Sequence, residues 1–228
     1  MFFDSQYLLW VALPTLILSL LAQTFVSSAY NRWSKARNSA GLTGVEVAER
    51  IFARTDVQRL PLEGAPGQLS DHYDPAKGVV RLSQGIATVP SVAAMAVVAH
   101  ELGHVQQYQE RSLLITARQF LVPGVRIAPQ IGYMMIFAGL ILNFSGLLWV
   151  GIALFGVMVV FMLLTLPVEF DASRRGLALL EQAGLMGTGE DRGGARQVLT
   201  AAALTYIAAA ITAILQLLYY VSLARRRN

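Results

Sequence analysis

Four apolar stretches, separated by polar segments, dominate the pattern of the chain. The first runs from Tyr7 to Ala22 and continues more weakly to Ala29. Because about 20 apolar residues cross the hydrocarbon core of a bilayer, this stretch predicts a membrane-spanning helix. A cleaved signal peptide is the alternative, with Ser27-x-Ala29 as its cleavage site. The residues before Tyr7 carry no positive charge, which favours a retained anchor.

A second apolar block, from Ile127 to Leu166, is too long for one helix and has no charged side chain. Asn143-Phe-Ser-Gly146 near its middle is typical of a tight turn, so the block predicts a hairpin of two spans. A last span extends from about Val198 to Leu223, and its alanines allow close helix approach. The pattern thus predicts about four helical spans.

The charges beside these spans give conflicting indications of orientation. Arg32, Lys35 and Arg37 directly follow the first span, which predicts that the next polar segment is cytoplasmic. Four spans would then place the basic tail at 225–227 on the opposite side, against the same rule. A re-entrant first or last segment would remove the conflict. We give the first span more weight and expect a cytoplasmic site.

The polar segment 31–126 has the signals of a small α+β domain. Thr43-Gly-Val-Glu46 is a capping box that predicts a helix reaching Arg54. Ser91 predicts the start of a second helix, which runs to Gln109 and is apolar nearly all round in its first half, as buried helices are. Three strands of an antiparallel sheet are expected at Val57–Leu62, Leu69–Tyr73 and Val79–Ser83.

These elements predict a mainly α, helical integral membrane protein with a small α+β domain at the membrane face. Its expected segments are an anchor (1–30), the α+β domain (31–126), a transmembrane hairpin (127–166), a further helix (167–197) and a C-terminal span with a basic tail (198–228).

Composition narrows the function classes. The 228 residues are 55% hydrophobic and 14% charged, whereas a soluble domain is nearer a quarter charged. The formal net charge of +4 is modest and the basic residues are scattered, which argues against a nucleic-acid partner. The chain has no cysteine, so cysteine proteases, disulfides and thiolate metal sites are excluded.

The chemistry is indicated by His100-Glu101-Leu102-Gly103-His104, which lies inside the expected buried helix. Histidines at i and i+4 share one helix face, so both can bind one zinc ion. Glu101 can take a proton from the metal's water as general base and return it to the leaving amine as general acid. A structural polar cluster is the alternative.

A catalytic zinc needs a third protein ligand and leaves a fourth position for water. The long metzincin pattern would require glycine at 107 and histidine at 110, but the chain has Gln107 and Glu110. His72 is the remaining histidine. Glu169, directly after the third span, is the preferred ligand; its alternative is an interfacial capping charge beside the arginines that follow it.

The chain resembles the YugP-type neutral zinc metallopeptidases, a family of bacterial membrane proteins, and more distantly the HtpX-type membrane peptidases. The resemblance covers most of the chain and implies a zincin-like domain. It is carried by Leu69-Ser-Asp-His-Tyr-Asp-Pro75, Val80-Arg-Leu-Ser83, Ala99-His-Glu-Leu-Gly-His104 with Gln107, and Leu166-Pro-Val-Glu-Phe-Asp-Ala172.

Several further residues are candidates for supporting roles. HtpX-type peptidases place an aspartate four residues after the ligand glutamate to orient a histidine; here that position is Ser173, and Asp171 comes two residues earlier. His72 or Tyr73 could stabilise an oxyanion, or could simply end a strand. A strand exposed at a sheet edge could pair with an extended peptide, and the candidate residues are Val79, Val80, Arg81, Leu82 and Ser83.

The sequence therefore predicts a zinc-dependent endopeptidase in the bacterial inner membrane, with one zinc, a membrane-associated protein or peptide substrate, and the lipid bilayer as partner. The resemblance implies a role in membrane protein quality control. Two alternatives are a membrane scaffold with a structural metal and a zinc hydrolase of non-peptide amides.

Overall fold

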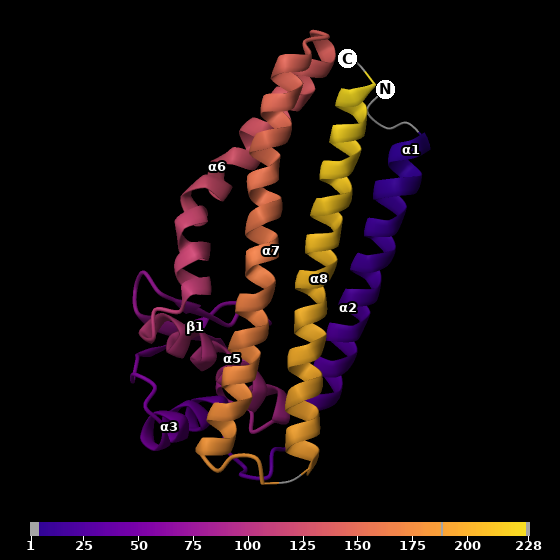
Figure 1. Ribbon diagram of the computed structural model, residues 1–228. Helices are drawn as coiled ribbons and strands as arrows, with labels where there is room; N and C mark the ends of the chain where they lie inside the picture. The colour runs from indigo at the N-terminus through magenta and orange to yellow at the C-terminus, as the bar shows by residue number, and fades with distance from the viewer. Residues whose placement is uncertain (1–4, 188, 227–228) are drawn as a thin grey trace. The chain divides into compact units, whose positions relative to one another are not determined.

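Helices make up most of the protein. The computed structural model describes residues 5–187 and 189–226. Four helices in it are long and apolar enough to cross a membrane, as predicted: Ser5–Trp33, Leu113–Ile141, Ser145–Gln182 and Gly189–Arg225. The first comprises α1 (Ser5–Tyr7), the π-helical η1 (Leu8–Ala12) and α2 (Leu13–Trp33), and the others are α6, α7 and α8 (Figure 1).

The chain forms two units, each built from segments far apart in the sequence. The helical unit consists of Met1–Ala22, Thr116–Pro167 and Leu204–Asn228. The site unit consists of Gln23–Ile115 and Val168–Ala203. Helices α2, α7 and α8 therefore contribute residues to both units. The separate helix predicted at 167–197 is wrong, because this segment contains the end of α7 (Ser145–Gln182) and the start of α8 (Gly189–Arg225).

In the helical unit, α6 and α7 form the expected hairpin, and glycines let them pack closely. A Cβ on Gly132 would lie 3.0 Å from the Gly151 oxygen, and one on Gly139 would lie 2.7 Å from the Leu148 nitrogen. Pro123 and Pro129 lie inside α6, where each removes a helical hydrogen bond. Figure 1 shows the resulting bend of α6.

The site unit contains a three-stranded sheet with the order β1-β3-β2. Strands β1 (Leu62–Ala65) and β3 (Val79–Ser83) run parallel, whereas β2 (His72–Asp74) is antiparallel to β3. The sheet is therefore mixed, not antiparallel as expected. The prediction that Val79, Val80, Arg81, Leu82 and Ser83 form an exposed edge is wrong, because β1 and β2 occupy both sides of β3.

Two strands begin later than the sequence predicts. β1 spans Leu62–Ala65 and shares only Leu62 with the strand predicted at Val57–Leu62, since Pro61 has no N–H to donate to a ladder. β2 begins at His72, because Leu69 has a φ of +53°, which no regular strand accommodates. The predicted bounds of β3 are confirmed.

The predicted helices of the site unit are confirmed, and α5 (Val92–Gln109) is buried along most of its length. Thr43 and Glu46 form the capping box at the start of α3 (Gly44–Arg54). The Ser91 hydroxyl accepts a hydrogen bond from the Ala94 N–H at 3.1 Å and caps α5. Helices α3 and α4 (Gln84–Ala87) and strands β2 and β3 all contact α5, so its polar residues are held in the core.

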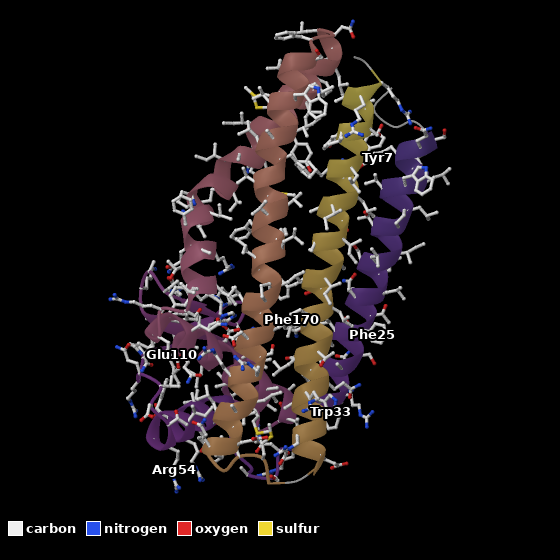
Figure 2. All side chains as sticks on the ribbon, viewed as in Figure 1. Tyr7, Phe25, Trp33, Arg54, Glu110 and Phe170 are labelled. Atoms are coloured by element: carbon white, nitrogen blue, oxygen red, sulfur yellow. The ribbon has the colours of Figure 1, made fainter. Side chains whose placement is uncertain are left out.

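The ends of α2 and α8 that belong to the site unit are joined by Trp33, labelled in Figure 2. Its indole N–H donates to the Gln197 side-chain oxygen at 2.7 Å. A Cβ on Gly194 would lie 2.6 Å from the indole ring, so glycine is needed for this contact. Trp33 thereby fixes both helices to the core around α5.

Candidate metal centre

Two glycines bring the backbones of α5 and α7 into contact. A Cβ on Gly103 would lie 2.3 Å from the Ala172 carbonyl oxygen, and one on Gly176 would lie 2.7 Å from the Ala99 carbonyl oxygen. Cβ atoms are essentially never found at these separations from backbone atoms, so glycine is required at both positions. The crossing places the 169–173 turn of α7 directly against the histidines of α5.

At this crossing His100, His104 and Glu169 converge. The Nε2 atoms of His100 and His104 lie 3.3 and 3.6 Å from Glu169 Oε2. One potential ligand atom from each residue lies within 4.8 Å of the others. The three residues expected from the sequence to bind a metal are therefore neighbours in the fold.

The donor atoms fit a zinc ion. Among the described residues, Glu169 Oε2 is a buried oxygen without a hydrogen-bond partner. The Nδ1 atoms of both histidines already have partners, Ser173 Oγ at 3.2 Å and Gln107 Oε1 at 3.0 Å, so Nε2 is the nitrogen left for a metal. Two imidazole nitrogens and one carboxylate oxygen are the protein ligands of many catalytic zinc sites.

Glu101 lies beside this cluster and is 7% exposed. The Tyr73 backbone N–H donates to Glu101 Oε2 at 2.8 Å, which restricts the orientation of the carboxylate. The Tyr73 ring meets the Tyr108 ring edge-on, with centroids 5.2 Å apart. Burial, together with the neighbouring Tyr108 and Asp74, raises the pKa of the Tyr73 phenol, so the hydroxyl is neutral at physiological pH.

The structure does not bring His72 to the cluster. Successive side chains of a strand point to opposite faces, so His72 and Tyr73 face different ways. The His72 ring has its Nδ1 2.8 Å from the Ser70 carbonyl oxygen and its Nε2 3.4 Å from Arg81 Nη1. On this face the hydrogen bond from Arg81 also lowers the pKa of Asp74.

Gln107 is a residue of the site to which the sequence reasoning assigned no role. It is fully buried on α5, three residues after His104 and hence on the same face. Its amide nitrogen donates to the Val168 carbonyl oxygen and to Asp171 Oδ2, each at 2.8 Å. A polar residue at this spacing in an apolar helix was the available signal.

The two residues expected to orient a histidine act differently. Ser173, at the position where the HtpX-type peptidases have an aspartate, has its Oγ 3.2 Å from His100 Nδ1. Asp171 contacts Gln107 instead of a histidine, and it also pairs with Arg174 and Arg175. Arg175 extends this network to Glu110 at the end of α5, over 2.7 Å. Glu110 is labelled in Figure 2.

The charges of the site raise the pKa of His104. Burial lowers the pKa of this imidazole, but its contact with Glu169 and the charges of Glu101 and Glu169 raise it by more. The pKa of His104 therefore lies above its ordinary value. A metal at Nε2 would compete with a proton for that nitrogen, and the two nearby carboxylates, Glu101 and Glu169, would favour a divalent cation there.

Comparisons with known proteins agree with this geometry. A family described as "Putative neutral zinc metallopeptidase" matches residues 8–225. The "Putative membrane protease YugP" of Bacillus subtilis (strain 168) is 38% identical over 213 residues, which cover 93% of this chain and 94% of that protein. No solved structure matches the chain significantly. The length of the family match and this identity show that the chain belongs to the neutral zinc metallopeptidase family.

Proposed function

We propose that the protein is a membrane-embedded, zinc-dependent endopeptidase of the gluzincin-like type. The observation that carries this proposal is the convergence of His100, His104 and Glu169, with the Glu101 carboxylate next to them on α5. Two neutral imidazoles, one carboxylate and an adjacent acid–base group form the set that metal-assisted peptide hydrolysis requires.

Each residue has one task in this proposal. His100, His104 and Glu169 would hold one zinc ion, which when bound supplies Lewis acidity and lowers the pKa of a bound water. Glu101 accepts a proton from the water that attacks the peptide carbonyl, and then delivers it to the nitrogen of the leaving amine. The Tyr73 N–H keeps the Glu101 carboxylate in position for both transfers.

The substrate would bind in an extended conformation. Strand β2 lies at an edge of the sheet, and the Tyr73 N–H contact links this strand to Glu101. A peptide lying in an extended conformation along β2 would therefore pass close to the acid–base group. This assigns to β2 the role that the sequence had suggested for the central strand β3.

Membrane proteins or membrane-proximal peptides are the substrates we propose. Glu169 follows the charge-free block that ends at Leu166 by three residues, within the same helix α7. The part of α7 that carries Glu169 is thus a direct continuation of an apolar segment. Together with the relative named a membrane protease, this supports a role in membrane protein quality control in the bacterial inner membrane. The basic residues after the first span favour a cytoplasmic site.

A structural metal is less compatible with the site. Structural zinc is bound by four protein ligands, and His72, the remaining histidine, is bonded to Ser70 and lies beside Arg81. Three protein ligands leave a position for water, which is the arrangement of a catalytic site.

The test compares zinc content and casein cleavage of purified wild-type protein, Glu101→Gln and the control Glu49→Gln in detergent. Glu49 is a surface residue of α3 paired with Arg59. We expect about one zinc per chain in all three, and a loss of roughly 100- to 10,000-fold in cleavage for Glu101→Gln alone. Equal cleavage by wild type and Glu101→Gln, or absence of zinc from wild type, would refute the proposal.

A further inference from the structure

The amide of Gln107 can take only one orientation in this structure. Its nitrogen faces the Val168 carbonyl oxygen and Asp171 Oδ2, and both of these atoms accept hydrogen bonds. Turning the amide over would place its oxygen against a carbonyl oxygen and a carboxylate oxygen, with no proton between them. The fully buried side chain could not replace these bonds with water.

This orientation determines which nitrogen of His104 carries the proton. Gln107 Oε1 lies 3.0 Å from His104 Nδ1 and can only accept a hydrogen bond. In the neutral imidazole His104 Nδ1 must then be the donor, which leaves the lone pair on Nε2, 3.6 Å from Glu169 Oε2. We propose that Gln107 is a positioning residue that holds His104 in the Nδ1–H tautomer, with Nε2 directed at the metal position.

His100 has no partner that fixes its tautomer in this way. His100 Nδ1 lies 3.2 Å from Ser173 Oγ, and a hydroxyl can both donate and accept. Ser173 is therefore compatible with either tautomer of His100. The two histidines of the motif therefore differ: the tautomer of His104 is fixed before a metal binds, and that of His100 is not.

The network behind Gln107 explains why its amide stays in place. Asp171 Oδ2, which accepts from Gln107, also accepts from Arg175 Nε at 2.6 Å. Arg175 Nη1 in turn donates to Glu110 Oε2 at 2.7 Å. Since Glu110 caps the C-terminus of α5 and Asp171 belongs to α7, the network joins both helices of the metal site.

The partner of His104 Nδ1 is a neutral group. Metal-binding histidines commonly donate their second N–H to a carboxylate, which makes the imidazole more basic. Here the acceptor is the neutral amide of Gln107. The Asp171 carboxylate contacts the other end of that amide and does not contact the imidazole. His104 is thus oriented firmly by a partner that adds no full negative charge to the ligand.

The test measures the tautomer of His104 by ¹⁵N NMR of histidine-labelled, metal-free protein at a pH where His104 is neutral. The chain has three histidines, so the variants His72→Asn and His100→Asn assign the signals. We expect an Nδ1–H signal for His104 in wild type and its loss or mixing with the Nε2–H form in Gln107→Met. An Nε2–H tautomer in wild type would overturn the proposal without any variant.

Zinc affinity, measured by competition with a chromogenic chelator, is the second readout. We expect Gln107→Met to weaken zinc binding by roughly 10- to 100-fold. Gln109→Met is the matched control: Gln109 lies on the same helix and also makes two hydrogen bonds, to the Asp56 carbonyl oxygen and from the Gln58 N–H, but outside the site. An unchanged affinity and tautomer in folded Gln107→Met, or an equal loss in Gln109→Met, would contradict the proposal.

This inference rests on the proposed function for its biological meaning, but it can fail separately. The tautomer is read in metal-free protein and does not depend on peptide cleavage. A protein that binds zinc through an Nδ1–H His104 and cleaves no peptide would refute the peptidase and leave the role of Gln107 intact.

Discussion

The backbone N–H of Tyr73 and the side chain of Glu101 are joined by a hydrogen bond of 2.8 Å, which links the edge strand β2 to the helix that carries both histidines. The contact uses a main-chain group, so a side-chain substitution that keeps the N–H should preserve it. We predict that Tyr73→Phe cleaves a model peptide at a rate close to wild type.

Tyr73→Pro should behave differently, because proline has no N–H to donate to Glu101. Proline is tolerated in edge strands where the N–H does not join the ladder. We expect kcat to fall on the order of 100-fold, as misplaced catalytic groups do, with zinc still bound. A large loss in Tyr73→Phe would instead assign the function to the hydroxyl, in agreement with an oxyanion role.

Glu169→Gln should weaken zinc binding more than any substitution of a residue that only orients a ligand. Such orienting residues typically contribute 10- to 100-fold to affinity, and we expect a larger loss here because a charged ligand becomes a neutral one. Addition of zinc should raise the unfolding temperature of wild type but not of this variant. Glu181→Gln, an exposed position on the same helix, is the control and should bind zinc as wild type does.

The contact of α5 with α7 predicts that Gly103→Ala is harmful although alanine favours helices. Its Cβ would overlap the Ala172 carbonyl oxygen, so the helices must separate. We expect a loss of about 1–3 kcal/mol in the free energy of unfolding and a clear loss of zinc affinity. The control is Gly193→Ala on α8, where a Cβ would meet nothing within 4 Å and helix propensity should stabilise the protein slightly.

The ion pair of Asp74 with Arg81 predicts a pH dependence of stability. The hydrogen bond from Arg81 lowers the pKa of Asp74 in the folded protein, so the pair stabilises the fold above the pKa that Asp74 has when unfolded. This stabilisation is lost as pH falls through the lowered folded pKa. Asp74→Asn should therefore have a lower unfolding temperature than wild type at pH 7, and the difference should vanish in acid. A difference that grows in acid would contradict this assignment.

The sequence predicted the parts of the fold that depend on local pattern. Charge-free apolar stretches gave four membrane-length helices, and Ser91 gave the start of α5. The spacing of His100 and His104 fixed their common face, since four residues are about one helical turn. These properties need no knowledge of the rest of the chain.

The remaining features depend on contacts between distant segments. The alternation in Val79–Ser83 predicts a strand, but its central place follows from the pairing of β1, which local pattern does not reveal. The group of Tyr73 that donates to Glu101 is the backbone N–H, which every residue except proline has. The identity of residue 73 therefore does not predict this contact. Gln107 was visible as a polar residue, whereas its orientation depends on Val168 and Asp171 across the helix crossing.

The metal ligands come from two places in the chain, and this sets the order in which the centre can be completed during synthesis. His100 and His104 precede the α6–α7 hairpin, and Glu169 follows most of it. A nascent chain that ends before α7 therefore carries the motif but lacks the third ligand. If hydrolysis requires the full set, a growing chain gains a complete centre only after synthesis has passed Glu169 in α7, so the two-histidine motif by itself is inactive throughout the making of the α6–α7 hairpin.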